Sequence, residues 1–128
     1  MELKDLLDLL ERLEGRVNAY WNFYSVAVFA VAGWLVAKEK FLSARSAILI
    51  ALGLSAFFFA NLGVIHSAER RIAAVEQEIS VVSQRSELSP AFSAHLQMLS
   101  IPNRGIYTVV LHLTIDAALL ALLYAKRA

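Results

Sequence analysis

The chain has 128 residues, of which 59% are apolar and 18% are charged, and its formal net charge at pH 7 is +1. A soluble domain of this size typically carries about a quarter charged residues and under half apolar ones, so this balance is unusual for a protein surrounded by water. The net charge gives no basis for nucleic-acid binding, and the absence of Cys excludes disulfides, thiolate metal sites and thiol nucleophiles.

The apolar residues are concentrated in three runs. Residues 17–37 and 46–68 contain no Asp, Glu, Lys or Arg, and residues 105–125 contain only Asp116. Each run is close to the roughly 20 residues that a helix needs to cross a hydrocarbon core about 30 Å thick. The sequence therefore predicts a single-domain, all-α integral membrane protein with about three transmembrane helices.

The first predicted helix, residues 2–37, begins as an amphipathic segment and continues into the first span. Its apolar positions alternate in steps of three and four residues, which is the heptad spacing typical of a coiled-coil seam. The second predicted helix, residues 43–87, also runs past its span, because no Pro or Gly interrupts residues 64–88. Its apolar residues repeat the same spacing, so its final third is expected to protrude into water.

The two seams predict an antiparallel hairpin that turns at residues 38–42. This turn places Leu3 against Ile79 and Leu10 against Ile72, since the paired residue numbers sum to 82. The alternative is an N-terminal helix lying on the lipid surface, but such helices are usually rich in Lys and Arg, whereas this one is acidic. We call the part of the hairpin outside the spans the stalk, and its predicted seam consists of Leu3, Leu6, Leu10, Leu13, Ile65, Ile72, Val75 and Ile79.

A short amphipathic helix is predicted over residues 90–101, before the third span. Ser89 is placed to cap its N-terminus, and Pro90 suits the first helical position because it lacks the amide hydrogen that would be unpaired there. The third span is predicted over residues 105–126. With three spans, the N-terminus and the stalk lie on one side of the membrane, and the turn and the C-terminus lie on the other.

Asp116 is the main candidate for a functional residue. An ionised carboxylate in the middle of a span costs at least about 2.5–3.5 kcal/mol, so it is expected to face protein or a water-filled cavity, or to stay protonated. His112 lies one turn away on the same helix face and can form an acid–base pair with it, and Thr108 continues this stripe. The hairpin register adds neighbours at similar depth, so the predicted intramembrane polar cluster is Asp116, His112, Asn61, Asn22 and Ser55.

Small residues recur at four-residue intervals in the half of the spans nearer the turn. Such ladders allow helix backbones to approach closely. The residues expected to pack helices in this way are Gly33, Ala37, Ala47, Ala51, Ala117, Ala121 and Ala125.

No catalytic residues, metal site or cofactor are predicted, and the chain is not expected to be an enzyme. It contains no phosphate-binding Gly-rich loop or nucleophile motif, and His112 with Asp116 would supply only two metal ligands. The polar cluster can serve as interhelical hydrogen-bonding groups or as a proton path. The corresponding functional hypotheses are a small homo-oligomeric ion or proton channel, a non-catalytic accessory or assembly subunit of a larger membrane complex, and a lipid-binding membrane protein.

The expected partners are membrane lipid and either further copies of the chain or a larger membrane complex, with no nucleic acid. The turn side concentrates positive charge in few residues, which favours a cytoplasmic turn and a non-cytoplasmic stalk. The raw count of Lys and Arg is higher on the stalk side, over a longer stretch, and favours the reverse orientation. The residues that carry this charge are Lys38, Lys40, Arg45, Lys126 and Arg127.

Overall fold

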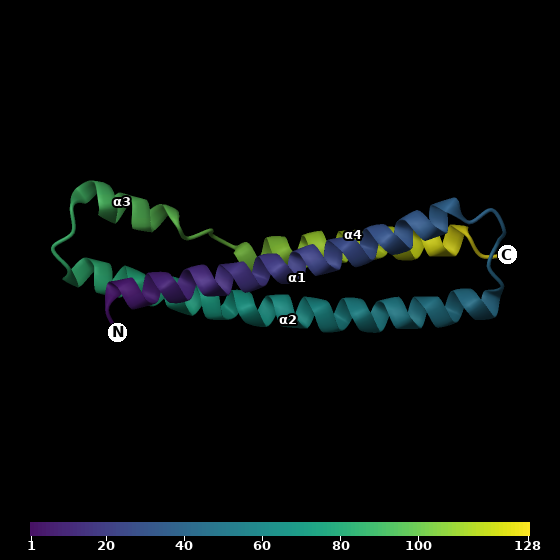
Figure 1. Ribbon diagram of the computed structural model, residues 1–128, viewed down its shortest axis with the longest axis horizontal. Coiled ribbons are helices and arrows are strands. Elements are labelled where there is room, and N and C mark those ends of the chain that lie inside the picture. The colour runs from purple at the N-terminus through teal and green to yellow at the C-terminus, as the bar shows by residue number, and fades with distance from the viewer.

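The computed structural model describes all residues 1–128 and contains four α-helices and no β-strand. Three of the helices are long and apolar enough to cross a membrane, which confirms the predicted all-α membrane fold. Figure 1 shows an elongated molecule in which the three long helices lie side by side and the short helix α3 stands apart near the N-terminal end. The helices are α1 (Leu3–Ala37), α2 (Ala44–Arg85), α3 (Pro90–Met98) and α4 (Arg104–Ala125).

Local sequence signals account for the helix boundaries. The Ser43 hydroxyl accepts a hydrogen bond from the Ser46 amide at 3.2 Å, and Ser89 caps α3 in the same way. α2 ends at Arg85 and α3 at Met98, slightly earlier than the sequence predicted. Asn103, which precedes α4, has a positive φ of 58°, a conformation that Asn tolerates better than most residues.

The hairpin of α1 and α2 has the predicted antiparallel arrangement. In the stalk, five of the eight predicted seam residues form one buried cluster with Val17 and with Leu96 of α3; they are Leu6, Leu10, Leu13, Ile72 and Ile79. Leu3 and Val75 pack against this cluster partly buried, and Ile65 is buried outside it. Within the membrane, the Tyr24 ring lies 6.4 Å from Phe57 and 6.3 Å from Phe58, measured between ring centroids. These residue numbers sum to 81 and 82, so one register extends along the whole hairpin. The seam also enters the membrane at seven-residue steps, through Val17 to Tyr24 on α1 and Ile65 to Phe58 on α2.

The C-terminus is fastened to the turn between α1 and α2. The Leu42 amide donates to the Lys126 carbonyl at 2.8 Å, and the Ala128 amide donates to the Leu42 carbonyl at 2.8 Å. The Lys126 ammonium donates to the Lys38 carbonyl at 3.1 Å. Because these bonds join the end of α4 to the turn, they set the depth of α4 relative to the hairpin.

Most of the small residues expected to pack helices face outward. Ala47 is buried and Ala51 half-buried, but a Cβ atom built on Gly33 would meet nothing within 4 Å. The interior positions near the turn are filled instead by larger apolar residues, including Leu35 and Leu119. The outward-facing small residues are Gly33, Ala37, Ala117, Ala121 and Ala125.

Candidate functional site

The buried polar residues lie along the interface of α2 and α4. Asn61 and Glu69 belong to α2, whereas Thr108, His112 and Asp116 follow one another at four-residue intervals on α4. No other polar or charged residue in the chain is buried to this degree. We call these five residues the polar file. It runs from the stalk-side end of the spans to the middle of α4.

Both carboxylate oxygens of Asp116 have a close partner. The Tyr24 hydroxyl donates to Oδ1 at 2.5 Å, and His112 Nδ1 lies 2.7 Å from Oδ2. Hydrogen bonds that involve a charged group are shorter and stronger than neutral ones. The acid within the third span is therefore sheltered by protein groups from α1 and α4, as a carboxyl group in a membrane requires.

His112 is fully buried and held from several sides. Its ring stacks on Tyr24 with centroids 4.1 Å apart, and Trp21 and Phe58 pack around it at 5.8 and 6.4 Å. The second ring nitrogen, Nε2, lies 3.1 Å from the Asn61 side-chain oxygen. The four residues Tyr24, Asn61, His112 and Asp116, here named the proton cluster, thus join α1, α2 and α4 through side-chain hydrogen bonds.

The contacts of His112 define how many protons this arrangement holds. With the Asn61 side-chain oxygen facing Nε2, a hydrogen on Nε2 completes this hydrogen bond, because that oxygen only accepts. A second proton must lie between Nδ1 and Asp116, since two lone pairs would repel at 2.7 Å. The cluster is then electrically neutral, either as an imidazolium–carboxylate pair or as a neutral imidazole beside a carboxylic acid. Removing one proton would leave Nε2 bare, and Asn61 would have to turn its amide group to donate to it.

The stalk-side end of the polar file is formed by Glu69 and Thr108. The Thr108 hydroxyl donates to Glu69 Oε1, while Glu69 Oε2 is buried and has no hydrogen-bond partner. One turn before Thr108, the Arg104 guanidinium lies 3.4 Å from Glu14 and 3.9 Å from Glu76. Burial raises the pKa of Glu76, and the nearby Arg104 charge opposes this shift. A hydrogen-bonded and ion-paired group of side chains therefore marks the point where the bundle leaves the membrane.

The turn-side end of the polar file is closed by apolar side chains. Beyond Asp116 and Tyr24, the buried positions are occupied by Leu35, Leu119 and Leu123. The file is therefore continuous with polar surroundings on the stalk side only, and it ends blind near the middle of the membrane.

The structure brings together three of the five residues that were expected to form the intramembrane cluster: Asn61, His112 and Asp116. Asn22 and Ser55 are exposed and hydrogen-bond to none of the three. Asn22 lies two residues from the inward-facing Tyr24, which is about 200° around the helix, and Ser55 lies six residues from Asn61, about 240° around α2. Similar depth in the membrane was thus not sufficient, because both side chains are exposed, and Ser55 lines a separate groove between α2 and α4 nearer the turn.

Sequence reasoning missed the roles of Tyr24 and Glu69. Tyr24 resembles an aromatic residue that anchors the membrane interface, although it lies seven residues after Val17 and so continues the seam inward. Glu69 lies just after the second span and resembles the other charged residues of the stalk surface. The sequence feature that could have identified Glu69 is its spacing. It lies four residues after the buried Ile65 and eight after Asn61, so all three share one face of the helix.

No group of three or more His, Cys, Asp or Glu side chains is placed to hold a metal ion. No known protein family, characterised protein or solved structure is significantly similar to this chain.

Proposed function

We propose that this chain is a small membrane protein that takes up and releases a proton inside the bilayer, at the proton cluster. The observation that carries the proposal is the hydrogen-bond arrangement of His112. Both of its ring nitrogens face oxygen atoms, at 2.7 Å from Asp116 and 3.1 Å from Asn61. This arrangement supports a cluster that is neutral with its proton bound and carries one negative charge without it.

The membrane makes these two states differ in stability. A net charge in the bilayer interior is costly, so the loss of a proton must be compensated by rearranged hydrogen bonds or by water entry. The compensating groups belong to different helices, since Tyr24 is on α1 and Asn61 on α2. Proton release would therefore alter the contacts between helices, which is the way in which buried His groups act in other pH-responsive proteins.

The same geometry favours proton binding within one protomer over a pore between protomers. His112 and Asp116 are directed into the three-helix bundle and are satisfied there, so they are not free to line an axis between copies. A continuous conduction path would require the apolar layer of Leu35, Leu119 and Leu123 to open, as hydrophobic gates do in channels. We infer that the arrangement described here corresponds to a closed pathway.

We further propose that the stalk side is non-cytoplasmic, because the positive charges around the turn are dense and close to the membrane. The proton would then exchange with the non-cytoplasmic solution. Since the chain has no Cys, single substitutions Ser80→Cys in the stalk and Lys40→Cys in the turn can report the orientation. Labelling of intact cells by an impermeant maleimide should reach the first and not the second, and the reverse pattern would overturn this orientation.

Infrared spectroscopy of the protein in lipid nanodiscs tests proton binding directly. A pH titration should produce a change in the carboxyl absorption that disappears in Asp116→Asn. Glu78→Gln, which alters an exposed carboxylate of the stalk, should keep that change and serves as the matched control. If no pH-dependent absorption is lost on substituting Asp116, the proposed function is wrong.

A second candidate function, an accessory subunit of a larger membrane complex, is supported by the outward-facing ladder on α4. Ala117, Ala121 and Ala125 are exposed, and small residues at this spacing allow close approach of another helix. Ala121→Leu should then disrupt association without affecting the infrared signal of Asp116. Native mass spectrometry from membrane vesicles measures this, and a wild-type chain that is released alone would contradict the candidate.

A further inference from the structure

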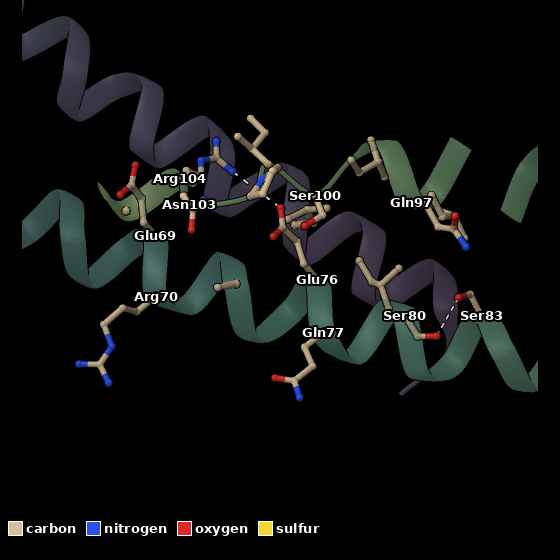
Figure 2. Close-up of a pocket in the computed structure, with 18 of the residues that line it drawn as sticks. Glu69, Arg70, Glu76, Gln77, Ser80, Ser83, Gln97, Ser100, Asn103 and Arg104 are labelled. Carbon is tan, nitrogen blue, oxygen red and sulfur yellow. Dashed lines mark hydrogen bonds and ion pairs between the residues drawn. The ribbon is translucent and has the colours of Figure 1, made fainter. Parts of the chain in front are cut away.

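A groove runs along the stalk beside the polar file. It has a volume of about 660 Å³ and lies between the stalk part of α2 and the segment formed by α3 and its linker to α4. Figure 2 shows that Glu69 and Glu76 project from α2 toward this linker, whereas Arg70 and Gln77 project from the opposite side of the helix. Most of the lining residues are polar, and the groove is open and extends to the membrane-side end of the stalk.

Glu69 connects this groove with the interior of the bundle. Its side chain lines the groove, yet the residue is only 6% exposed. One oxygen, Oε1, accepts the hydrogen bond from Thr108, and the other, Oε2, is buried and unpaired. An unpaired carboxylate oxygen that is withdrawn from bulk water is unfavourable unless it serves a purpose, and here it is available to accept a proton.

The spacing along α4 places the proton cluster within reach of this pair. Thr108 and His112 are four residues apart, a rise of about 6 Å. The Thr108 hydroxyl and the His112 ring thus lie on one face of α4, one turn apart, and a hydrogen-bonded water is the link that the proposal requires between them. Glu69 is thus the titratable group of the polar file that lies between the groove and the cluster.

We propose that Glu69 and Thr108 admit the proton from the groove to the proton cluster, an inference that rests on the proposed function. A rotation of the Glu69 side chain first carries Oε2 from its buried position to the groove, where a hydronium ion transfers its proton to it and becomes water. The resulting carboxylic acid turns about its terminal bond and donates to the Thr108 hydroxyl, which passes its own proton onward to the deprotonated cluster. Glu69 returns to the carboxylate, Thr108 regains one proton, and the cluster gains one.

Other charged groups surround this entry without taking part in it. Arg104 of α4 is engaged by Glu14 of α1 and Glu76 of α2, and His66 is exposed at the edge of the groove near Gly105. Arg70 is directed away from Glu69.

The test is the rate at which the cluster takes up a proton after a rapid pH drop, followed by the Asp116 infrared absorption in nanodiscs. Glu69→Gln should slow this rate by at least roughly tenfold, because glutamine cannot carry the proton, while the equilibrium titration of Asp116 keeps its amplitude. Thr108→Val should slow it as well. Glu69→Asp, which restores a carboxyl group, should recover most of the rate, and Glu78→Gln should not change it.

The outcomes separate the two proposals. A normal uptake rate in Glu69→Gln, with Asp116 still titrating, would overturn the entry role and leave the proposed function intact. Loss of both rate and amplitude in Glu69→Gln and Glu69→Asp alike would indicate a structural role and would also overturn the entry role. If Asp116 of the wild type does not titrate at all, the proposed function fails, and the entry role fails with it.

Discussion

The stalk and the membrane-spanning part of the hairpin are built from the same two helices and both have buried apolar clusters, but they differ in their exposed faces and in the polar residues that they bury. In the stalk, leucine and isoleucine side chains fill the interior and charged residues face water. In the membrane part, large apolar residues such as Phe29 and Phe59 are more than three-quarters exposed, and the polar file lies inside. The heptad spacing continues through both parts. The outward-facing residues differ because the stalk is surrounded by water and the membrane part by lipid.

This difference changes what stabilises each part. Apolar burial stabilises the stalk, because its alternative is contact with water. In the membrane, lipid is as apolar as leucine, so apolar packing supplies little driving force and the interhelical hydrogen bonds gain importance. The predictions that follow use substitutions of each kind in each region, from the largest expected effect to the smallest.

The largest effect is expected for Ile72→Ala in the stalk. Ile72 is fully buried, and removing its side chain should reduce the free energy of unfolding of the stalk by about 2–5 kcal/mol. Thermal unfolding followed by circular dichroism in detergent measures this loss. Leu52→Ala, at a lipid-facing position of the same helix, is the matched control and should change stability by less than about 0.5 kcal/mol. Equal losses at the two sites would contradict the comparison.

A smaller but clear loss is expected for Asp116→Ala in the membrane part. The substitution leaves His112 Nδ1 without its partner and the Tyr24 hydroxyl with only its 3.4 Å contact to the His112 carbonyl, and an unpaired buried polar group costs about 1–3 kcal/mol. Steric trapping in bicelles can measure the change in unfolding free energy. Thr114→Ala, at an exposed position on the same helix, should have little effect. A neutral or stabilising result for Asp116→Ala would show that the cluster does not hold the helices together.

Tyr24→Phe should cost less, about 0.6 kcal/mol, the average for an interhelical hydrogen bond in a membrane protein. The ring and its stacking on His112 are kept, while the hydroxyl loses its bond to Asp116 and its longer one, 3.4 Å, to the His112 carbonyl. The same steric-trapping measurement applies. Because the two residues share one bond, the loss in the double variant with Asp116→Ala should be smaller than the sum of the single losses. Strict additivity would mean that this bond contributes nothing.

The smallest effect is a pH dependence of the stalk that arises from Glu76. Because burial raises the pKa of Glu76 in the folded state, the folded protein binds the proton more tightly than the unfolded chain. The contribution of Glu76 protonation to the free energy of unfolding is then fully present below the ordinary glutamate pKa of 4.5. It is lost as the pH rises above 4.5 and through the raised pKa of the folded state. The melting temperature of the wild type, compared with that of Glu76→Gln across this range, reports the effect. A difference between the two that does not change with pH would rule it out.

Much of the fold was predictable from the sequence because it depends on local or repeating signals. The three uncharged runs predicted the spans, since a helix in lipid needs about 20 apolar residues regardless of its neighbours. The alternating spacing of the stalk residues, among them Leu10 and Ile72, predicted the hairpin and its register. Ser89 and Pro90 predicted the start of the short helix for equally local reasons.

The candidate site was predictable only in part, because depth in the membrane and direction around a helix are separate quantities. The pairing of His112 with Asp116 follows from their spacing on one helix, and Asn61 was placed at the right depth by the hairpin register. Direction decided the rest, so that Asn22 and Ser55 are exposed while Tyr24 is buried.

The sequence by itself determined that the chain is a helical membrane protein with an acid in its third span that needs shelter. That follows from the cost of charge in hydrocarbon, which applies wherever the helices are placed. Only the tertiary structure decided which groups shelter the acid, because Tyr24, Asn61 and Asp116 come from three helices whose rotation depends on the packing of all of them together. It likewise decided that the small residues of α4 face outward and that Glu69, at the stalk-side end of the polar file, lines the groove.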